Sequence, residues 1–120
     1  MLVRHLSPVL NQLSILGVKV NRAKSIRPTS VRHLRKKLIG SSFKTVTRRG
    51  KYLLFEMKPS GRVLPFMLLG HLGMTGRMYL QPATQILQKH AAVVFNLGDQ
   101  NFVFEDVRYF GRLTLDETPL

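Results

Sequence analysis

The sequence predicts an α+β fold, a β-sandwich of six to eight mostly antiparallel strands with two flanking helices. Three observations lead to this prediction. The 120 residues suit a single domain, and 44% of them are hydrophobic, which is enough for one core. Apolar residues before Gly40 recur at helical spacing. From Phe43 onward, short segments rich in β-branched and aromatic residues alternate with turn residues.

The first forty residues predict two helices and one strand. Leu2–Leu13 has apolar residues at helical spacing, with Pro8 tolerated in a first turn that Ser7 would cap. Ile15–Lys24 is typical of a strand. The second helix has the apolar stripe Val31, Leu34 and Leu38, with Ser30 before it and Gly40 after it. Its other faces are basic, and either solvation or phosphate contact explains Arg32, His33, Arg35, Lys36 and Lys37.

The remaining strands follow from alternation and from turn residues. We predict them over Phe43–Arg48, Lys51–Met57, Val63–Leu69, Ala91–Leu97, Phe102–Glu105 and Arg112–Leu115. Arg49-Gly50 would connect the first two, and Gly98–Asn101 would form a hairpin turn. Pro65 indicates an edge strand or the start of a strand.

Charge is the strongest global signal. Nineteen Lys and Arg against six acids give a net charge of +13, and 13 of the 19 basic residues lie in positions 1–55. Such a chain attracts polyanions, so nucleic acid is the leading partner, with a solvated basic surface, a ribosomal protein or a membrane-surface protein as alternatives. Without cysteine, disulfides and thiolate zinc sites are excluded. No apolar run is long enough to span a membrane, and a reducing cytoplasm is the natural compartment.

Three segments have the composition of binding loops. Residues 48–53 combine two Arg, a Gly and a Lys at a strand junction, and residues 70–77 contain three glycines around Met74. In residues 105–112, Arg and aromatic residues precede Gly111. An exposed Met, Arg and Phe suit a probe of duplex DNA, because apolar side chains can wedge between base steps and Arg can replace an extruded base. Core packing of Met74 and Phe110, and an Arg108–Asp106 ion pair, are the ordinary alternatives.

The order RRGKYLL, HLGMTGR, KH and D-x-R-x-FGRL resembles the N-terminal domain of the formamidopyrimidine-DNA glycosylase and endonuclease VIII family. The similarity runs from Val3 to Leu115. It implies base excision repair, in which a damaged base is flipped out of double-stranded DNA and excised, and the abasic site is then nicked. It also implies that Lys51 contacts the lesion site and its phosphate. The resemblance further assigns DNA-backbone contacts to His71 and Lys89, with His90 beside them. It assigns void filling to Met74, Arg108 and Phe110. Together with the basic residues of the same segments, the expected DNA-binding residues are Arg48, Arg49, His71, Lys89, His90 and Arg112.

The sequence departs from the family pattern at its start. Family members begin with Pro-Glu-Leu-Pro-Glu-Val-Glu, whose proline amine is the nucleophile and whose first glutamate handles protons, whereas this sequence reads Met1-Leu2-Val3-Arg4 and has no acid before Glu56. A piece of a longer protein, a misplaced start and a non-catalytic relative all fit. The family's C-terminal helix-two-turn-helix unit and zinc finger are also outside residues 1–120. Locally, Ala92 replaces a histidine and Val107 a proline.

Two functions therefore compete, and only a covalent intermediate with DNA separates them. The first is a damage-recognition domain of a DNA glycosylase and abasic-site lyase for oxidised bases, weakly active or inactive on its own. The second is a non-catalytic module that senses distorted duplex. A basic ribosome-associated protein is a third hypothesis. We expect no cofactor, no metal and no membrane partner, a bacterial nucleoid-associated location, and damaged or abasic duplex DNA as the partner.

Overall fold

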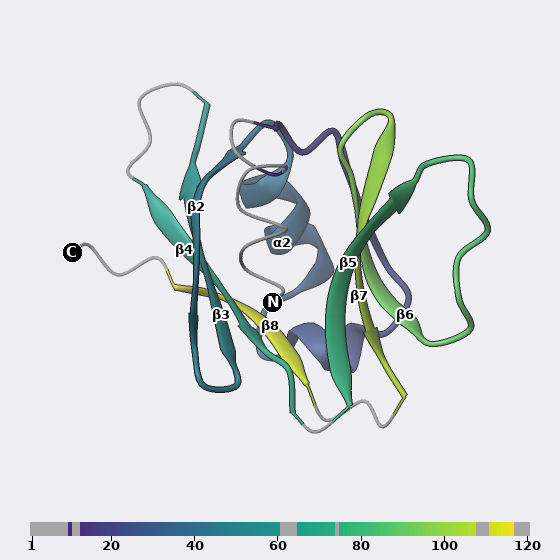
Figure 1. Ribbon diagram of the computed structural model, residues 1–120. Coiled ribbons are helices and arrows are strands. Elements are labelled where there is room, and N and C mark those ends of the chain that lie inside the picture. The colour runs from purple at the N-terminus through teal and green to yellow at the C-terminus, as the bar shows by residue number, and fades with distance from the viewer. Residues whose placement is uncertain (1–9, 11–12, 61–64, 74, 108–110, 117–120) are drawn as a thin grey trace.

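The computed structural model of this chain describes residues 10, 13–60, 65–73, 75–107 and 111–116. They form two antiparallel sheets of four strands each, which pack face to face (Figure 1). Sheet A has the strand order β2-β3-β4-β8, and sheet B has the order β1-β6-β7-β5. The predicted α+β sandwich is therefore confirmed, at the upper end of the expected strand number.

Sheet A is built from four strands whose inner faces are apolar. They are β2 (Ser42–Arg49), β3 (Tyr52–Lys58), β4 (Phe66–His71) and β8 (Arg112–Asp116). Buried and partly exposed residues alternate along β3 and β4, as the period of two in a pleated strand requires. Pro65 directly precedes β4, which agrees with its prediction as the start of a strand.

Sheet B consists of β1 (Gly17–Val20), β5 (Gly76–Pro82), β6 (Ala91–Asn96) and β7 (Gln100–Asp106). β6 and β7 are buried almost continuously because their outer face also packs against apolar groups. Ala91, Val94 and Val103 form this second cluster, with Tyr79 and Leu87 against it. The result is a long apolar run in place of simple alternation.

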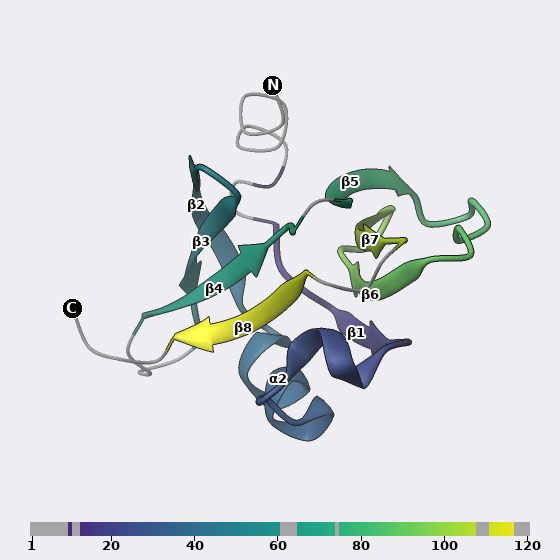
Figure 2. The same ribbon diagram turned by 90° about the horizontal axis from the view of Figure 1, so that it is seen from below.

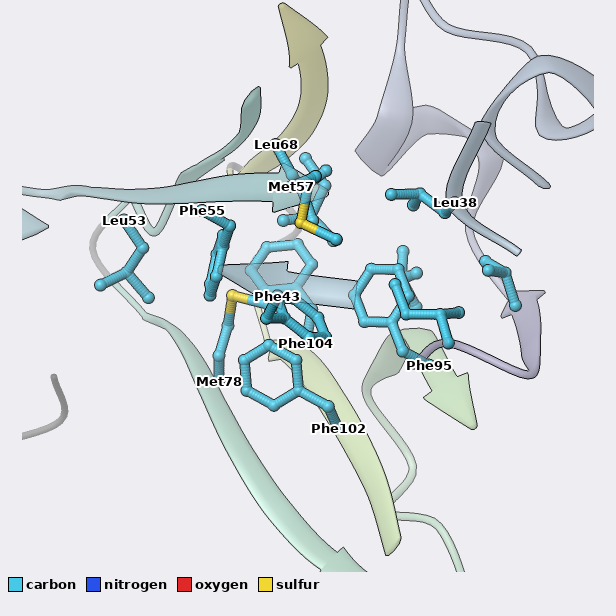
Figure 3. Packing of buried hydrophobic residues seen from close by; sticks show 14 of the residues in the cluster. Leu38, Phe43, Leu53, Phe55, Met57, Leu68, Met78, Phe95, Phe102 and Phe104 are labelled. Atoms are coloured by element: carbon cyan, nitrogen blue, oxygen red, sulfur yellow. The ribbon is translucent and has the colours of Figure 1, made fainter. Parts of the chain in front are cut away.

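The main core lies between the sheets and is centred on phenylalanines. Phe43 and Phe55 come from sheet A, and Phe95 and Phe102 come from sheet B (Figure 3). The Phe102 ring lies 5.9 Å from Phe43 and 5.7 Å from Phe55 between centroids, both edge to face. Such pairs add attraction beyond the apolar area that they bury.

One α-helix, α2 (Val31–Leu38), closes a side of the sandwich together with the 3-10 helix η1 (Ala23–Ile26) (Figure 2). The Ser30 side chain accepts a hydrogen bond from the His33 amide, and Leu34 and Leu38 are buried, as predicted. Contacts of α2 with β1 and of η1 with β8 cover edge strands of the two sheets. Part of the basic face is engaged within the protein, since Arg35 Nε donates to the Val18 carbonyl at 2.9 Å.

Several predicted boundaries were wrong. The strand expected over Ile15–Lys24 is confined to Gly17–Val20, and η1 follows it. The turn expected over Gly98–Asn101 is shorter, because Gln100 and Asn101 already belong to the paired strand β7.

Two flanking helices were expected, but the described residues contain one α-helix. The other predicted helix, over Leu2–Leu13, lies almost entirely outside the described residues. No helix among the described residues is long and apolar enough to cross a membrane.

The glycine-rich segment 70–77 is the largest correction. It was predicted as one loop, yet Gly70 and His71 end β4, and Gly76 begins β5, a strand that the sequence prediction missed. The reason is that β5 is defined by its pairing with β7, from Gly76 opposite Asp106 to Pro82 opposite Gln100. Glycines favour turns in isolation, but a partner strand can hold them extended.

Candidate nucleic-acid interface

Strand register brings the three motif segments to one edge of the sandwich. His71, at the end of β4, pairs with Tyr52 at the start of β3 on one side and with Arg112 at the start of β8 on the other. In sheet B, Gly76 at the start of β5 pairs with Asp106 at the end of β7. These strand ends and the β2–β3 turn lie along the lower side of the sandwich in Figure 1, which we call the motif edge.

The β2–β3 hairpin projects cations from this edge. Gly50 and Lys51 form its turn, between the paired residues Arg49 and Tyr52. Gly50 has a φ of 60°, a conformation that a side chain disfavours, and its carbonyl accepts a hydrogen bond from Arg48 Nε at 3.0 Å. Arg48, Arg49 and Lys51 are exposed. Lys51 was predicted to begin the strand, but it lies in the turn, where its ammonium group can reach outward.

The β4–β5 connection is tied to the hairpin. The Leu72 amide donates to the Lys51 carbonyl at 3.0 Å, and the Gly76 amide donates to the Leu72 carbonyl at 2.8 Å. A Cβ on Gly76 would lie only 2.2 Å from the Leu72 oxygen, so this loop closes only around glycine. Met74, the predicted wedge in this loop, lies outside the described residues.

The β7–β8 connection carries the other predicted void-filling residues, Arg108 and Phe110, which also lie outside the described part of the chain. Its described ends are fixed. Gly111 is buried, and its amide donates to Asp106 Oδ2 at 2.6 Å. Thr75 Oγ1, from the β4–β5 loop, lies 2.6 Å from Asp106 Oδ1.

The other predicted DNA-binding residues, His71, Lys89, His90 and Arg112, lie at or next to the same edge. His71 is half-buried, and its ring meets that of Tyr52 edge to face at 4.7 Å between centroids. Lys89 is exposed and His90 half-buried, directly before β6, and the His90 carbonyl accepts from the Asp106 amide at 3.1 Å. Arg112 is half-buried, and one of its terminal nitrogens donates to the Gly111 carbonyl at 3.1 Å.

An acid sits beside these cations on the outer face of sheet B. Glu105 accepts hydrogen bonds from Arg77 Nε at 2.8 Å and from the Tyr79 hydroxyl at 2.9 Å. Burial raises the pKa of the Glu105 carboxyl, but these hydrogen bonds and the Arg77 charge outweigh burial and leave the pKa below its usual value. Burial and the bond to Glu105 raise the pKa of Tyr79 to about 12.

The geometry therefore unites most of the predicted site. Of the seven predicted residues that the structure describes, five lie on the motif edge: Arg48, Arg49, Lys51, His71 and Arg112. The other two, Lys89 and His90, adjoin it through the backbone hydrogen bond between Asp106 and His90. Exposed guanidinium and ammonium groups of this kind suit a phosphate backbone. The sequence reasoning missed Tyr52, which is 47% exposed on this edge, and the buried Asp106. The adjacency of Tyr52 to the RRGK segment was an available signal; for Asp106 there was none beyond its place in the motif.

The described residues contain no group of three or more His, Asp or Glu side chains that could hold a metal ion.

Comparison with known proteins gives a consistent result. The profile of the formamidopyrimidine-DNA glycosylase N-terminal domain matches residues 1–113. A formamidopyrimidine-DNA glycosylase of Carboxydothermus hydrogenoformans is 32% identical over 113 residues, which are 94% of this chain and 41% of that protein. One of Desulforamulus reducens is 37% identical over 119 residues, 98% of this chain and 41% of that protein.

Solved structures agree with these sequence matches. The Lactococcus lactis Fpg in complex with abasic-site DNA superposes with a TM-score of 0.86 at 28% identity, covering 98% of this chain and 42% of that chain. A complex of Lactococcus lactis Fpg with FAPY-dG DNA gives the same TM-score at 29% identity, again over 98% of this chain and 42% of that chain. The chain thus spans about two fifths of the relatives that it matches. From profile, sequence and fold together, this chain belongs to the formamidopyrimidine-DNA glycosylase N-terminal domain family.

Proposed function

We propose that this chain is the damage-recognition domain of a base-excision-repair DNA glycosylase and abasic-site lyase, and that its partner is double-stranded DNA with a damaged base or an abasic site. The observation that carries the proposal is the strand register that gathers three separate motif segments on one edge. A net charge of +13 adds long-range attraction to the duplex. The relatives in DNA complexes support the same partner.

Within this proposal the motif edge has two kinds of residue. Lys51 contacts the lesion and its phosphate from the hairpin turn, and the backbone is held by Arg48, Arg49, His71, Lys89, His90 and Arg112. Met74, Arg108 and Phe110 fill the space left by the extruded base. The phosphate-contacting residues give affinity, and the void-filling residues give preference for damage, because a weakened base step costs less free energy to open.

We further propose that residues 1–120 fold as one domain and cut DNA weakly or not at all by themselves. The family resemblance implies that an N-terminal proline and a glutamate carry out the cleavage, and this sequence has no acid before Glu56. The helix-two-turn-helix unit and the zinc finger of that family are not among these residues. In a bacterial cell, such a domain would work on the chromosome in the cytoplasm.

The alternative is a module that binds distorted duplex without any chemistry. The charge favours it equally, because phosphate contacts need no nucleophile. Sodium borohydride separates the two proposals, since it reduces a Schiff base between a protein amine and the sugar C1′ to a stable covalent link. A duplex with one abasic site, incubated with the chain and borohydride, gives a covalent protein–DNA band if lyase chemistry remains.

Binding itself is tested by its dependence on salt and on damage. Neutralising about six phosphates gives a slope of log affinity against log salt of about −5. A slope near zero would refute the proposed phosphate contacts. We expect tighter binding to the abasic duplex than to an undamaged duplex of the same sequence. Equal binding to both, or a clear preference for single-stranded RNA, would overturn the damage-recognition role.

A further inference from the structure

Asp106 is a buried acid that joins two loops. Asp106 lies at the end of β7 and is 0% exposed. Its Oδ1 lies 2.6 Å from the Thr75 hydroxyl, and its Oδ2 accepts from the Gly111 amide at 2.6 Å. Both distances are short, as expected for hydrogen bonds to a carboxylate. One side chain therefore holds the β4–β5 loop with one oxygen and the β7–β8 connection with the other.

The two anchored residues stand directly beside the proposed void-filling residues in the sequence. Thr75 follows Met74, and Gly111 follows Phe110. Each bond to Asp106 thus fixes the chain one residue away from a side chain that we propose to enter the duplex. The register adds a third constraint, because Gly76 pairs with Asp106 itself.

The packing around this joint leaves little freedom. A Cβ on Gly111 would lie 2.7 Å from the His71 oxygen and 2.7 Å from Phe104 Cζ, so a side chain there would separate the Gly111 amide from Asp106. The backbone amide of Asp106 also donates to the His90 carbonyl at 3.1 Å. The position of Asp106 is therefore linked to the Lys89–His90 segment of the motif edge.

We propose that Asp106 is a positioning residue, which ties Thr75 of the β4–β5 loop to Gly111 before β8 and thereby supports the damage preference proposed for the motif edge. This inference rests on the void-filling roles proposed above, and Asp106 itself acts through the loops without touching DNA. Groups that are held in place before binding lose less conformational entropy when they engage the duplex. A buried carboxylate is a costly way to gain stability alone, because it must be fully hydrogen-bonded to be tolerated.

The first test needs no DNA and asks whether the two loops are coupled. Thr75→Val removes the hydroxyl but keeps a similar shape, and Thr75→Ser keeps the hydroxyl as a matched control. Because Thr75→Val removes the hydrogen bond to Asp106 Oδ1, we expect the Gly111 amide, which is bound to Oδ2 of the same carboxylate, to exchange its hydrogen roughly tenfold faster in this variant. Unchanged exchange at Gly111 in Thr75→Val would overturn the coupling.

The second test measures damage preference with Asp106 variants. Asp106→Ala should lower the ratio of affinities for abasic and undamaged duplex roughly tenfold, as loss of a charge-assisted bond network implies, and leave the salt slope unchanged. Asp106→Asn should retain most of the preference, since its amide can accept from Gly111 and donate to the Thr75 oxygen. The inference is wrong if Asp106→Ala keeps the wild-type preference, or if Asp106→Asn loses as much as Asp106→Ala.

The two proposals fail in different ways. If the wild-type chain shows no preference for abasic duplex, the proposed function is refuted, and the exchange experiment still decides whether the loops are coupled. If the wild-type preference is present and Asp106→Ala keeps it, only the positioning role is refuted. Should Asp106→Ala not fold, Thr75→Val takes its place in the binding experiment, with the same expected loss of preference and the same contrary result.

Discussion

Gly76→Ala tests the close approach that shapes the motif edge. The added Cβ would lie 2.2 Å from the Leu72 oxygen and 2.9 Å from the Leu72 carbonyl carbon, both backbone atoms that no rotamer change can move. Forced overpacking of this kind costs about 1–3 kcal/mol. The substitution also separates the Gly76 amide from the Leu72 oxygen, now 2.8 Å away, at a cost of about 0.5–1.5 kcal/mol. We therefore expect the free energy of unfolding to fall by about 1.5–4.5 kcal/mol.

Urea denaturation followed by far-ultraviolet circular dichroism measures this loss, and two other glycines serve as controls. Gly17→Ala meets only Asn96 Cβ at 3.7 Å, an ordinary contact, and in a strand it should change stability by less than about 1 kcal/mol, in the stabilising direction. Gly50→Ala has open space but a φ of 60°, which costs about 1–2 kcal/mol. A Gly76→Ala loss below about 1 kcal/mol, or one no larger than that of Gly50→Ala, would refute the steric argument.

Three further predictions concern charge, pH and the core. Lys51→Ala should weaken duplex binding and make the salt slope about one unit shallower, whereas Lys58→Ala, the same change at the opposite end of β3, should leave both nearly unchanged in a fluorescence anisotropy titration. The pKa of Glu105 is lowered in the folded protein, so Glu105 should stabilise the fold above pH 4.5 and lose this contribution as pH falls through the lowered value. The pKa of Tyr79 is raised from 10.0 to about 12, so its contribution should be present below pH 10 and lost as pH rises toward 12. Urea midpoints against pH would check both, and Glu105→Gln should flatten the acid side; an unchanged acid limb would contradict the assignment. Phe102→Ala should destabilise the fold by about 3–5 kcal/mol, since its buried ring contacts aromatic rings of both sheets, and a loss below about 2 kcal/mol would argue against that packing.

The proposed function assigns affinity and damage preference to different residues of the motif edge. Exposed cations on the hairpin can follow any phosphate backbone, so they give binding that depends on salt and not on sequence. We propose that preference for damage depends instead on Asp106, whose hydrogen bonds hold Thr75 and Gly111. Variants of Lys51 and of Asp106 should therefore change different observables.

Local patterns in the sequence were sufficient for α2 and most of sheet A. The Ser30 cap and the Leu34–Leu38 stripe lie within one short segment, and the alternation in β3 needs no distant partner to be visible. These features are determined by neighbours in the sequence, because helix capping and strand pleating act over a few residues. The net charge and the order of the motifs are also visible in the sequence alone, and they led to the family that the comparisons then established.

Long-range pairing decided what local patterns could not. β5 begins with glycine and lacks clear alternation, and it is a strand because β7 offers it a hydrogen-bonding partner. Asp106 belongs to the D-x-R-x-FGRL motif, but its role as the common acceptor of two loops follows only from its burial and its hydrogen bonds. The sequence by itself therefore determined the fold class, the partner's charge and the residue types of the site. Only the tertiary structure decided that these residues share one edge, because strand register and buried hydrogen bonds join residues that are distant in the sequence, such as Thr75 and Asp106.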